Sequence, residues 1–296
     1  MADPEILAIR QEIAKRPRPA EISEMRANTD ARGRAFGLPK DVTVTPVSAN
    51  GVQAEWTATP DAATDAALLY VHGGGYVIGS LDSHRHMVAE LGRASGIRAL
   101  SLGYRLAPEH RFPAAVEDTV AAYRFLLSSG IRPNRIVIGG DSAGGGLVVG
   151  AMLAIKDAGL PACAAGWCIS PWVDMEALGA SFTDRADTDP NVQKQTILFM
   201  AEQYMGSADR RSPYAAPIYG DLKGLPPLLI QVGACETLLD DSIQLARKAG
   251  MADVPVDLQI WPEMIHIWHI FHPVLGAGRR AIAAGGAFVK STLRGA

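Results

Sequence analysis

The chain has 296 residues, of which 48% are hydrophobic and 20% are charged, and its formal net charge is −3. This length suffices for one large domain with a buried core, and the composition is that of an ordinary soluble globular protein. The slight negative charge gives no electrostatic basis for binding nucleic acid, and the one dense basic run, Lys15–Arg18, is too short to supply it.

The N-terminal 40 residues predict helices that are interrupted by Pro17 and Pro19. The first 16 residues mix charges throughout and lack the apolar stretch of a signal peptide. The longest apolar run, Ala143–Ile155, is too short and too rich in glycine to span a bilayer. We therefore expect neither a signal peptide nor a membrane segment.

Short β-rich runs follow, and after the third of them strands alternate with helices. The predicted strands are Val42–Val47, Val52–Thr57, Ala67–His72, Ile97–Leu102, Ile136–Gly140, Ala164–Ile169, Leu228–Gly233 and Val256–Trp261. The predicted helices are Asp82–Ala94, Ala114–Ser129, Ala143–Asp157, Asp240–Ala249 and Gly276–Leu293. This pattern predicts an α/β fold with a mostly parallel, eight-stranded sheet, flanking helices and an antiparallel start.

One segment breaks the alternation. Residues 176–212 contain no predicted strand but include an amphipathic run, Val192–Met205. We interpret this insertion, together with residues 1–40, as a helical cap over the ligand-binding edge of the sheet. The core then comprises residues 41–175 and 213–296.

The stretch Gly140-Asp141-Ser142-Ala143-Gly144 fits the pattern G-x-S-x-G, with a strand before it and a helix after it. A strand that turns at once into a helix strains the central residue and leaves no room for side chains at the flanking positions. A glycine-rich structural turn is the alternative. The context favours Ser142 as a nucleophile, with the free N–H groups of the following helix facing a developing oxyanion.

His72-Gly73-Gly74-Gly75-Tyr76 follows the third predicted strand. Three consecutive glycines make sense where backbone N–H groups approach a ligand closely, and with the N–H of Ala143 they would form an oxyanion hole. A nucleotide-binding loop is the alternative, but neither G-x-G-x-x-G nor G-K-[ST] accompanies it. We expect His72 to brace the loop rather than to catalyse.

A serine nucleophile needs a base, and His266 lies just after the last predicted strand. The end of that strand can deliver an imidazole to the sheet edge that carries Ser142. His266, His269 and His272 could instead suggest a metal site, but their spacing does not keep them on one helix face, and we expect no metal. The remaining histidines, His84, His86 and His110, are interpreted as surface or structural residues.

An orienting carboxylate should follow the strand Leu228–Gly233. Glu236 lies three residues beyond that strand, whereas Asp240 and Asp241 are interpreted as the N-terminal cap of a helix. We favour Glu236, with Asp240 as its rival. The resulting order, Ser142, Glu236, His266, is the serine–acid–histidine order of α/β-hydrolases.

The chain resembles the hormone-sensitive-lipase-like carboxylesterases, bacterial family IV of the α/β-hydrolase superfamily. The resemblance rests on the motifs HGGGY, YRLAPEHRFPAA and GDSAGGG, which occur in this order from about Val42 to Leu293. It implies an α/β-hydrolase fold with a mainly helical cap, with Ser142 as nucleophile and His266 as base. It also implies an oxyanion hole made by the N–H groups of Gly74, Gly75 and Ala143.

The chain departs from the family pattern at three places. Glu236-Thr237-Leu238 replaces the usual Asp-Pro-Leu, and His266-Ile267-Trp268 replaces His-Gly-Phe. Gly103 stands where the family commonly has aspartate. The longer acid can still reach a histidine, but its assignment is less direct, and the loop after the base is expected to differ in shape.

These observations predict a serine carboxylesterase that hydrolyses short-chain acyl esters through an acyl-enzyme and needs no cofactor. An amide hydrolase of the same fold is one alternative. A small-molecule receptor without catalysis is another alternative. Such a receptor should lack part of the triad, whereas each part of the triad has a candidate residue here.

The cysteines and the last strand bear on location and assembly. Cys163, Cys168 and Cys235 have no metal-type spacing and indicate a reduced cytoplasm. The apolar edge run 256–261 suggests a homodimer.

Overall fold

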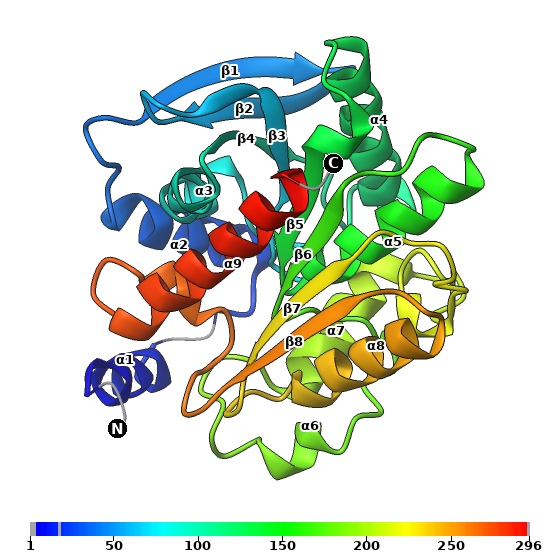
Figure 1. The fold of residues 1–296 in the computed structure, drawn as a ribbon. Coiled ribbons are helices and arrows are strands. Elements are labelled where there is room, and N and C mark those ends of the chain that lie inside the picture. The colour runs from blue at the N-terminus through cyan, green and yellow to red at the C-terminus, as the bar shows by residue number, and fades with distance from the viewer. Residues whose placement is uncertain (1–3, 17–18, 295–296) are drawn as a thin grey trace.

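The computed structural model describes residues 4–16 and 19–294, so Pro17 and Arg18 of the basic run lie outside the described residues. The described residues form one eight-stranded sheet (Figure 1). Its strands are β1 (Thr43–Ala49), β2 (Val52–Ala58), β3 (Ala63–Val71), β4 (Ile97–Gly103), β5 (Ile136–Asp141), β6 (Ala165–Ile169), β7 (Leu228–Gly233) and β8 (Val256–Trp261).

The strand order is β1-β2-β4-β3-β5-β6-β7-β8. β2 runs antiparallel to both β1 and β4, and every pair from β4 to β8 is parallel. The predicted mostly parallel sheet with an antiparallel start is therefore confirmed. β3 begins four residues earlier than predicted, because the polar stretch from Ala63 pairs with Ile97 before a register shift at Ala67.

Helices cover both faces of the sheet. They are α1 (Glu5–Ala14), α2 (Ile22–Ala35), α3 (Leu81–Ser95), α4 (Ala114–Ser128), α5 (Ala143–Asp157), α6 (Ser181–Asp184), α7 (Lys194–Met205), α8 (Leu239–Met251) and α9 (Gly276–Arg294). α3 and α9 pack together on one face, and α4 and α5 pack together on the other (Figure 1).

The pleat of β3 divides the core between these two layers. Leu68 and Tyr70 belong to the cluster with residues of α3 and α9. Leu69 and Val71 belong to the cluster with residues of α4 and α5. Alternate side chains of a strand point to opposite faces, so a run of apolar residues as continuous as β3 is suited to a strand that is covered on both sides.

Two helices outside these layers bury apolar residues in different clusters: α1 packs against the segment after β8, and α7 packs into the main core. Ile6 and Ile13 of α1 are buried in a cluster with Trp268 and Phe271. α7 buries Ile197, Met200 and Tyr204. Among the described residues, no helix has both the length and the apolar content that crossing a membrane requires.

Candidate active site

The turn between β5 and α5 consists of Ser142 alone. Its backbone has φ 54° and ψ −120°, a conformation that serine adopts only where the surroundings enforce it. The N–H of Ser142 donates to the carbonyl of Ile169, and the N–H of Trp172 donates to the carbonyl of Ser142. These bonds on both sides of the residue hold the turn in place.

The flanking glycines are required by close backbone contacts. A Cβ atom at Gly140 would lie 2.5 Å from the carbonyl oxygen of Gly144. A Cβ atom at Gly144 would lie 2.1 Å from the carbonyl oxygen of Val71. Both distances are below any real contact of this kind, so only glycine allows β5 to turn directly into α5.

Ser142 is buried, with 8% of its surface exposed, and it lines a cavity of about 340 Å³. His266, Gly74 and Gly75 line the same cavity. Residues of α2 and α7 complete its wall, including Met25, Thr29, Ile197 and Met200. The structure thus brings four of the six expected site residues to one cavity.

His266 and Glu236 form a buried pair at the ends of neighbouring strands. The Nδ1 atom of His266 lies 2.6 Å from Oε2 of Glu236. The other carboxylate oxygen of Glu236 accepts from the hydroxyl of Ser170, at 2.9 Å, and from the N–H of Gly233. With both oxygens engaged, the carboxylate can hold the imidazole in one orientation with Nδ1 protonated.

The surroundings of His266 also set its charge. Burial lowers the pKa of His266, but the hydrogen bond and the charge of Glu236, with weaker contributions from Asp189 and Asp141, outweigh it. The pKa of His266 therefore lies above its ordinary value. An imidazole with this bias accepts a proton readily from a neighbouring hydroxyl.

Asp240, the rival of Glu236, and its neighbour Asp241 have other hydrogen-bond partners. Oδ2 of Asp240 accepts from the N–H of Ser181, at 2.9 Å. Oδ2 of Asp241 accepts from the N–H groups of Val173 and Asp174. The expectation that these two aspartates cap α8 is therefore wrong: the N-cap residue is Leu238, without a side-chain cap, and the aspartates instead bind the segment that follows β6.

The glycine loop after β3 also adopts conformations that need glycine. Gly74 has φ 110° and Gly75 has φ 62°, and a Cβ atom at Gly74 would lie 2.3 Å from the carbonyl oxygen of Ile78. Ala143 is the first residue of α5, so its N–H has no acceptor within the helix. The loop and the helix start thus offer N–H groups beside Ser142.

Asp141 is a functional candidate that the sequence analysis missed. It is completely buried, and its Oδ1 accepts from the hydroxyl of Tyr70, at 2.7 Å, and from the N–H of Gly73, at 3.1 Å. Its Oδ2 lies 3.3 Å from Nε2 of His84. Asp141 therefore fixes the glycine loop to the end of β5. A carboxylate at the end of an apolar strand was the available signal.

The other histidines have structural contacts. Nδ1 of His72 lies 2.7 Å from the carbonyl oxygen of Gly73, and burial lowers the pKa of His72 to about 4, so the ring is neutral and braces the loop as expected. His84 and His86, interpreted as surface or structural residues, are structural, because they are only 5% and 3% exposed. His110 is exposed.

The three histidines near the C-terminus do not converge. His266 contacts Glu236, whereas Nε2 of His269 lies 3.0 Å from Oε1 of Gln231. Residues 4–16 and 19–294 contain no cluster of three side chains that could hold a metal ion. Cys163 and Cys168 are buried and free, and Cys235 is free and half-buried.

Comparisons with known proteins show the family of this chain. A family model described as alpha/beta hydrolase fold matches residues 68–270. The acetyl-hydrolase of Streptomyces hygroscopicus is 46% identical over 297 residues, which cover 98% of each chain. The crystal structure of an esterase from the bacterial hormone-sensitive lipase family is 48% identical, with a TM-score of 0.95 and coverage of 98% of this chain and 97% of that one. An esterase/lipase from an uncultured bacterium is 46% identical, with a TM-score of 0.95 and coverage of 99% and 100%.

Proposed function

We propose how this chain, which belongs to the alpha/beta hydrolase family and is a carboxylesterase of the hormone-sensitive-lipase type, cleaves its substrate: Ser142 attacks the ester carbonyl, His266 moves the proton and Glu236 orients His266. The observation that carries this assignment is the 2.6 Å contact between Nδ1 of His266 and the buried carboxylate of Glu236. It leaves Nε2 as the ring nitrogen available to Ser142.

The reaction has two halves. Nε2 of His266 takes the proton of the Ser142 hydroxyl as Oγ bonds to the carbonyl carbon, and the N–H groups of Gly74, Gly75 and Ala143 bind the resulting oxyanion. The imidazolium then protonates the leaving alcohol, which leaves an acyl-enzyme. Water, deprotonated by His266, attacks this intermediate and releases the acid and the free serine.

The test is covalent labelling. A fluorophosphonate should modify Ser142 and abolish hydrolysis of p-nitrophenyl acetate, with the adduct located by peptide mass spectrometry. Ser142→Ala should lose both the label and the activity while its circular dichroism spectrum stays unchanged. A folded Ser142→Ala protein that keeps substantial activity would refute the assignment.

We also propose that residues 1–40 and 176–212 act as a cap over this site. Support comes from the cavity wall, to which α2 contributes Met25 and Thr29 and α7 contributes Ile197 and Met200. A wall assembled from these helices encloses the ester while the core supplies the reacting groups. The substrate is then a small ester, and short acyl groups such as acetyl fit best.

Two further proposals concern the whole protein. The exposed edge of β8 makes it a candidate surface for a homodimer, since an unpaired strand edge can pair with a second copy.

The free and buried thiols of Cys163 and Cys168 suit a reduced compartment, and we propose the cytoplasm. Cell fractionation tests the location.

A further inference from the structure

The substrate cavity carries positive charge without a matching negative charge. Within the described residues, the charged side chains that line it apart from histidine are Arg16 and Arg32, and no aspartate or glutamate lines it. Ser142 and His266 line the same space. A ligand that reaches the serine therefore enters a cavity with two guanidinium groups in its wall.

Within the described part of the chain, these arginines differ from two arginines of α2 in having no ion-pair partner. Arg26 and Arg34, on the same helix α2, pair with Glu109 and Asp82 at 2.7 and 2.8 Å. Arg32 instead donates to the hydroxyl of Thr29, at 3.1 Å. Among residues 4–16 and 19–294, no carboxylate lies within 4.0 Å of the guanidinium of Arg16 or Arg32.

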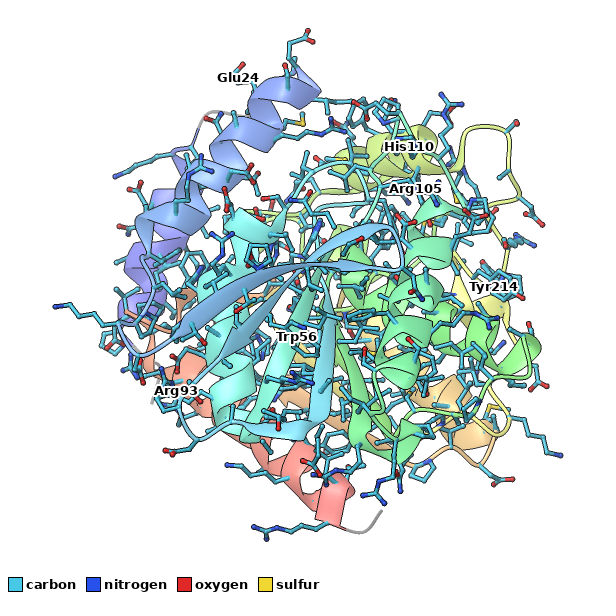
Figure 2. All side chains as sticks on the ribbon, turned by 90° about the horizontal axis from the view of Figure 1, so that it is seen from above. Glu24, Trp56, Arg93, Arg105, His110 and Tyr214 are labelled. Atoms are coloured by element: carbon cyan, nitrogen blue, oxygen red, sulfur yellow. The ribbon has the colours of Figure 1, made fainter. Side chains whose placement is uncertain are left out.

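The residues of α2 that line the cavity, Arg32 among them, lie on one face of this helix. The cavity-lining positions recur at helical spacing and form one face, which comprises Met25, Asn28, Thr29, Arg32 and Gly33 of α2 and its C-cap residue Phe36. Glu24 projects from α2 away from the rest of the molecule (Figure 2). The middle of the cavity-lining face is polar, whereas its two ends, Met25 and Phe36, are apolar.

The two cations also disfavour each other. Arg32 is exposed at the rim of the cavity, and desolvation of its guanidinium by the surrounding wall, and secondly the charge of Arg16, lower the pKa of Arg32. An anion placed beside both guanidinium groups would relieve this repulsion and accept their N–H donors. The cavity is thus electrostatically incomplete until such a group is bound.

We propose that Arg16 and Arg32 form a subsite for an anionic group of the substrate, so that the enzyme prefers small esters carrying a carboxylate or phosphate away from the scissile bond. The inference rests on the proposed function of Ser142 in the same cavity. Anionic oxygens suit the planar guanidinium, and a neutral substrate leaves both cations without an anionic partner among the described residues.

Two matched pairs of esters test the proposal and locate the charge. In the first pair, 3-acetoxybenzoate and 3-acetoxybenzamide, the anionic group lies in the leaving group. In the second pair, the mono-p-nitrophenyl esters of adipic acid and of adipic monoamide, the anionic group lies in the acyl group. The measured quantity is the ratio of kcat/KM for the anionic ester to that for the neutral ester. This ratio should exceed one in at least one pair and should fall in 0.5 M NaCl.

The variants separate a local effect from a general one. Arg32→Gln should lower the ratio about fivefold, as expected for losing one charge near an anion in a wet site, and Arg32→Lys should retain most of it. Arg16→Gln combined with Arg32→Gln should lower the ratio further. Arg34→Gln removes the same charge from the same helix but outside the cavity lining, and it should leave the ratio unchanged.

Three outcomes of these assays would overturn the proposed anion subsite. Equal kcat/KM within both pairs, with hydrolysis that still depends on Ser142, would overturn the anion subsite and leave the esterase assignment standing. An equal fall of the ratio in Arg34→Gln and Arg32→Gln would also overturn it, by showing a general surface effect. Failure to hydrolyse any of the four esters while p-nitrophenyl acetate is still cleaved would overturn this inference alone, whereas failure on p-nitrophenyl acetate as well would overturn the proposed function with it.

Discussion

At the scale of single residues, two carboxylates lie four positions apart in the chain but have different partners. Glu236 contacts His266, whereas Asp240 accepts from the N–H of Ser181. Glu236→Gln should lower kcat by orders of magnitude, since losing the orienting acid costs on the order of 10⁴-fold in a serine protease. Asp240→Asn keeps an acceptor oxygen for Ser181 and should retain nearly full kcat. Steady-state kinetics on p-nitrophenyl acetate compares them, and inactivation by Asp240→Asn alone would show that the acid is misassigned.

The charge of His266 gives a second prediction. Catalysis needs the neutral imidazole, so kcat/KM should rise with pH as His266 loses its proton. Because the pKa of His266 lies above its ordinary value, the midpoint of this rise should lie above about 6.5. Glu236→Gln removes the charge that raises this pKa and should move the midpoint down. The test is the pH dependence of kcat/KM for both proteins, and a midpoint that does not move would contradict the role of Glu236.

The residues of the proposed triad can be selected from the sequence because each follows a recognisable strand. Ser142 lies between glycines two positions before and two positions after it, and this pattern can be recognised in the sequence. His266 follows the last apolar run. The position of Asp141 at the end of an apolar strand marks it as a candidate, but the partners of Asp141 and Asp241 were not predictable. Both are buried carboxylates whose partners, the loop at Gly73 and the N–H groups of Val173 and Asp174, lie 67 to 68 positions away. Contacts at that separation depend on the tertiary fold rather than on local pattern.

At the scale of elements, the last helix shows why glycine can be tolerated where propensity disfavours it. Gly285 and Gly286 weaken the prediction of α9, yet the helix forms over Gly276–Arg294. A Cβ atom at Gly285 would lie 1.8 Å from Cζ2 of the buried Trp167, and one at Gly286 would lie 2.4 Å from the backbone of Ala94. The glycines let α9 approach the sheet and α3, and that packing outweighs the lower helix propensity. The four-residue α6, in contrast, is too short to produce a periodic pattern.

A matched pair of substitutions tests this explanation. Gly250 lies in α8 and, apart from its chain neighbours and the backbone of its own helix, no atom lies within 4 Å of its would-be Cβ, so Gly250→Ala should raise the free energy of unfolding by about 0.5–1 kcal/mol. Gly285→Ala gains the same helix propensity but presses on Trp167, and overpacking of a core costs roughly 1–3 kcal/mol. It should therefore lower stability. Urea unfolding followed by circular dichroism measures both, and equal stabilisation by the two variants would contradict the packing argument.

At the scale of the whole molecule, the cavity limits the acyl chain. Its volume of about 340 Å³ is at the low end for small-molecule sites, and its lining includes the polar residues Asn28, Thr29 and Asn191. Phe182, Tyr204 and Met205 of the cap are buried in the main core, which leaves less apolar surface for a ligand. Each added CH₂ contributes about 0.8 kcal/mol only where such surface exists. Across a p-nitrophenyl ester series, kcat/KM should be highest between acetate and hexanoate, and a maximum at laurate or beyond would contradict the small-cavity argument.

The two edges of the sheet differ in a way that favours one mode of assembly. β1 carries Pro46, which lacks an N–H group and is typical of a strand protected from pairing. β8 has no proline, pairs with β7 alone within the described part of the chain, and exposes 44% of Ile260. We therefore expect two copies to associate along β8.

Light scattering coupled to size-exclusion chromatography should give twice the chain mass of 31.4 kDa at micromolar concentration. Ile260→Lys places a charge at the proposed interface and should shift the mass toward that of the monomer, because a buried unpaired charge is strongly unfavourable. Thr45→Lys adds the same charge to the exposed surface of β1 and should leave the dimer intact. A monomeric mass for the unmodified protein would count against the β8 interface. A dimer that Thr45→Lys disrupts and Ile260→Lys leaves intact would move the interface to the opposite edge.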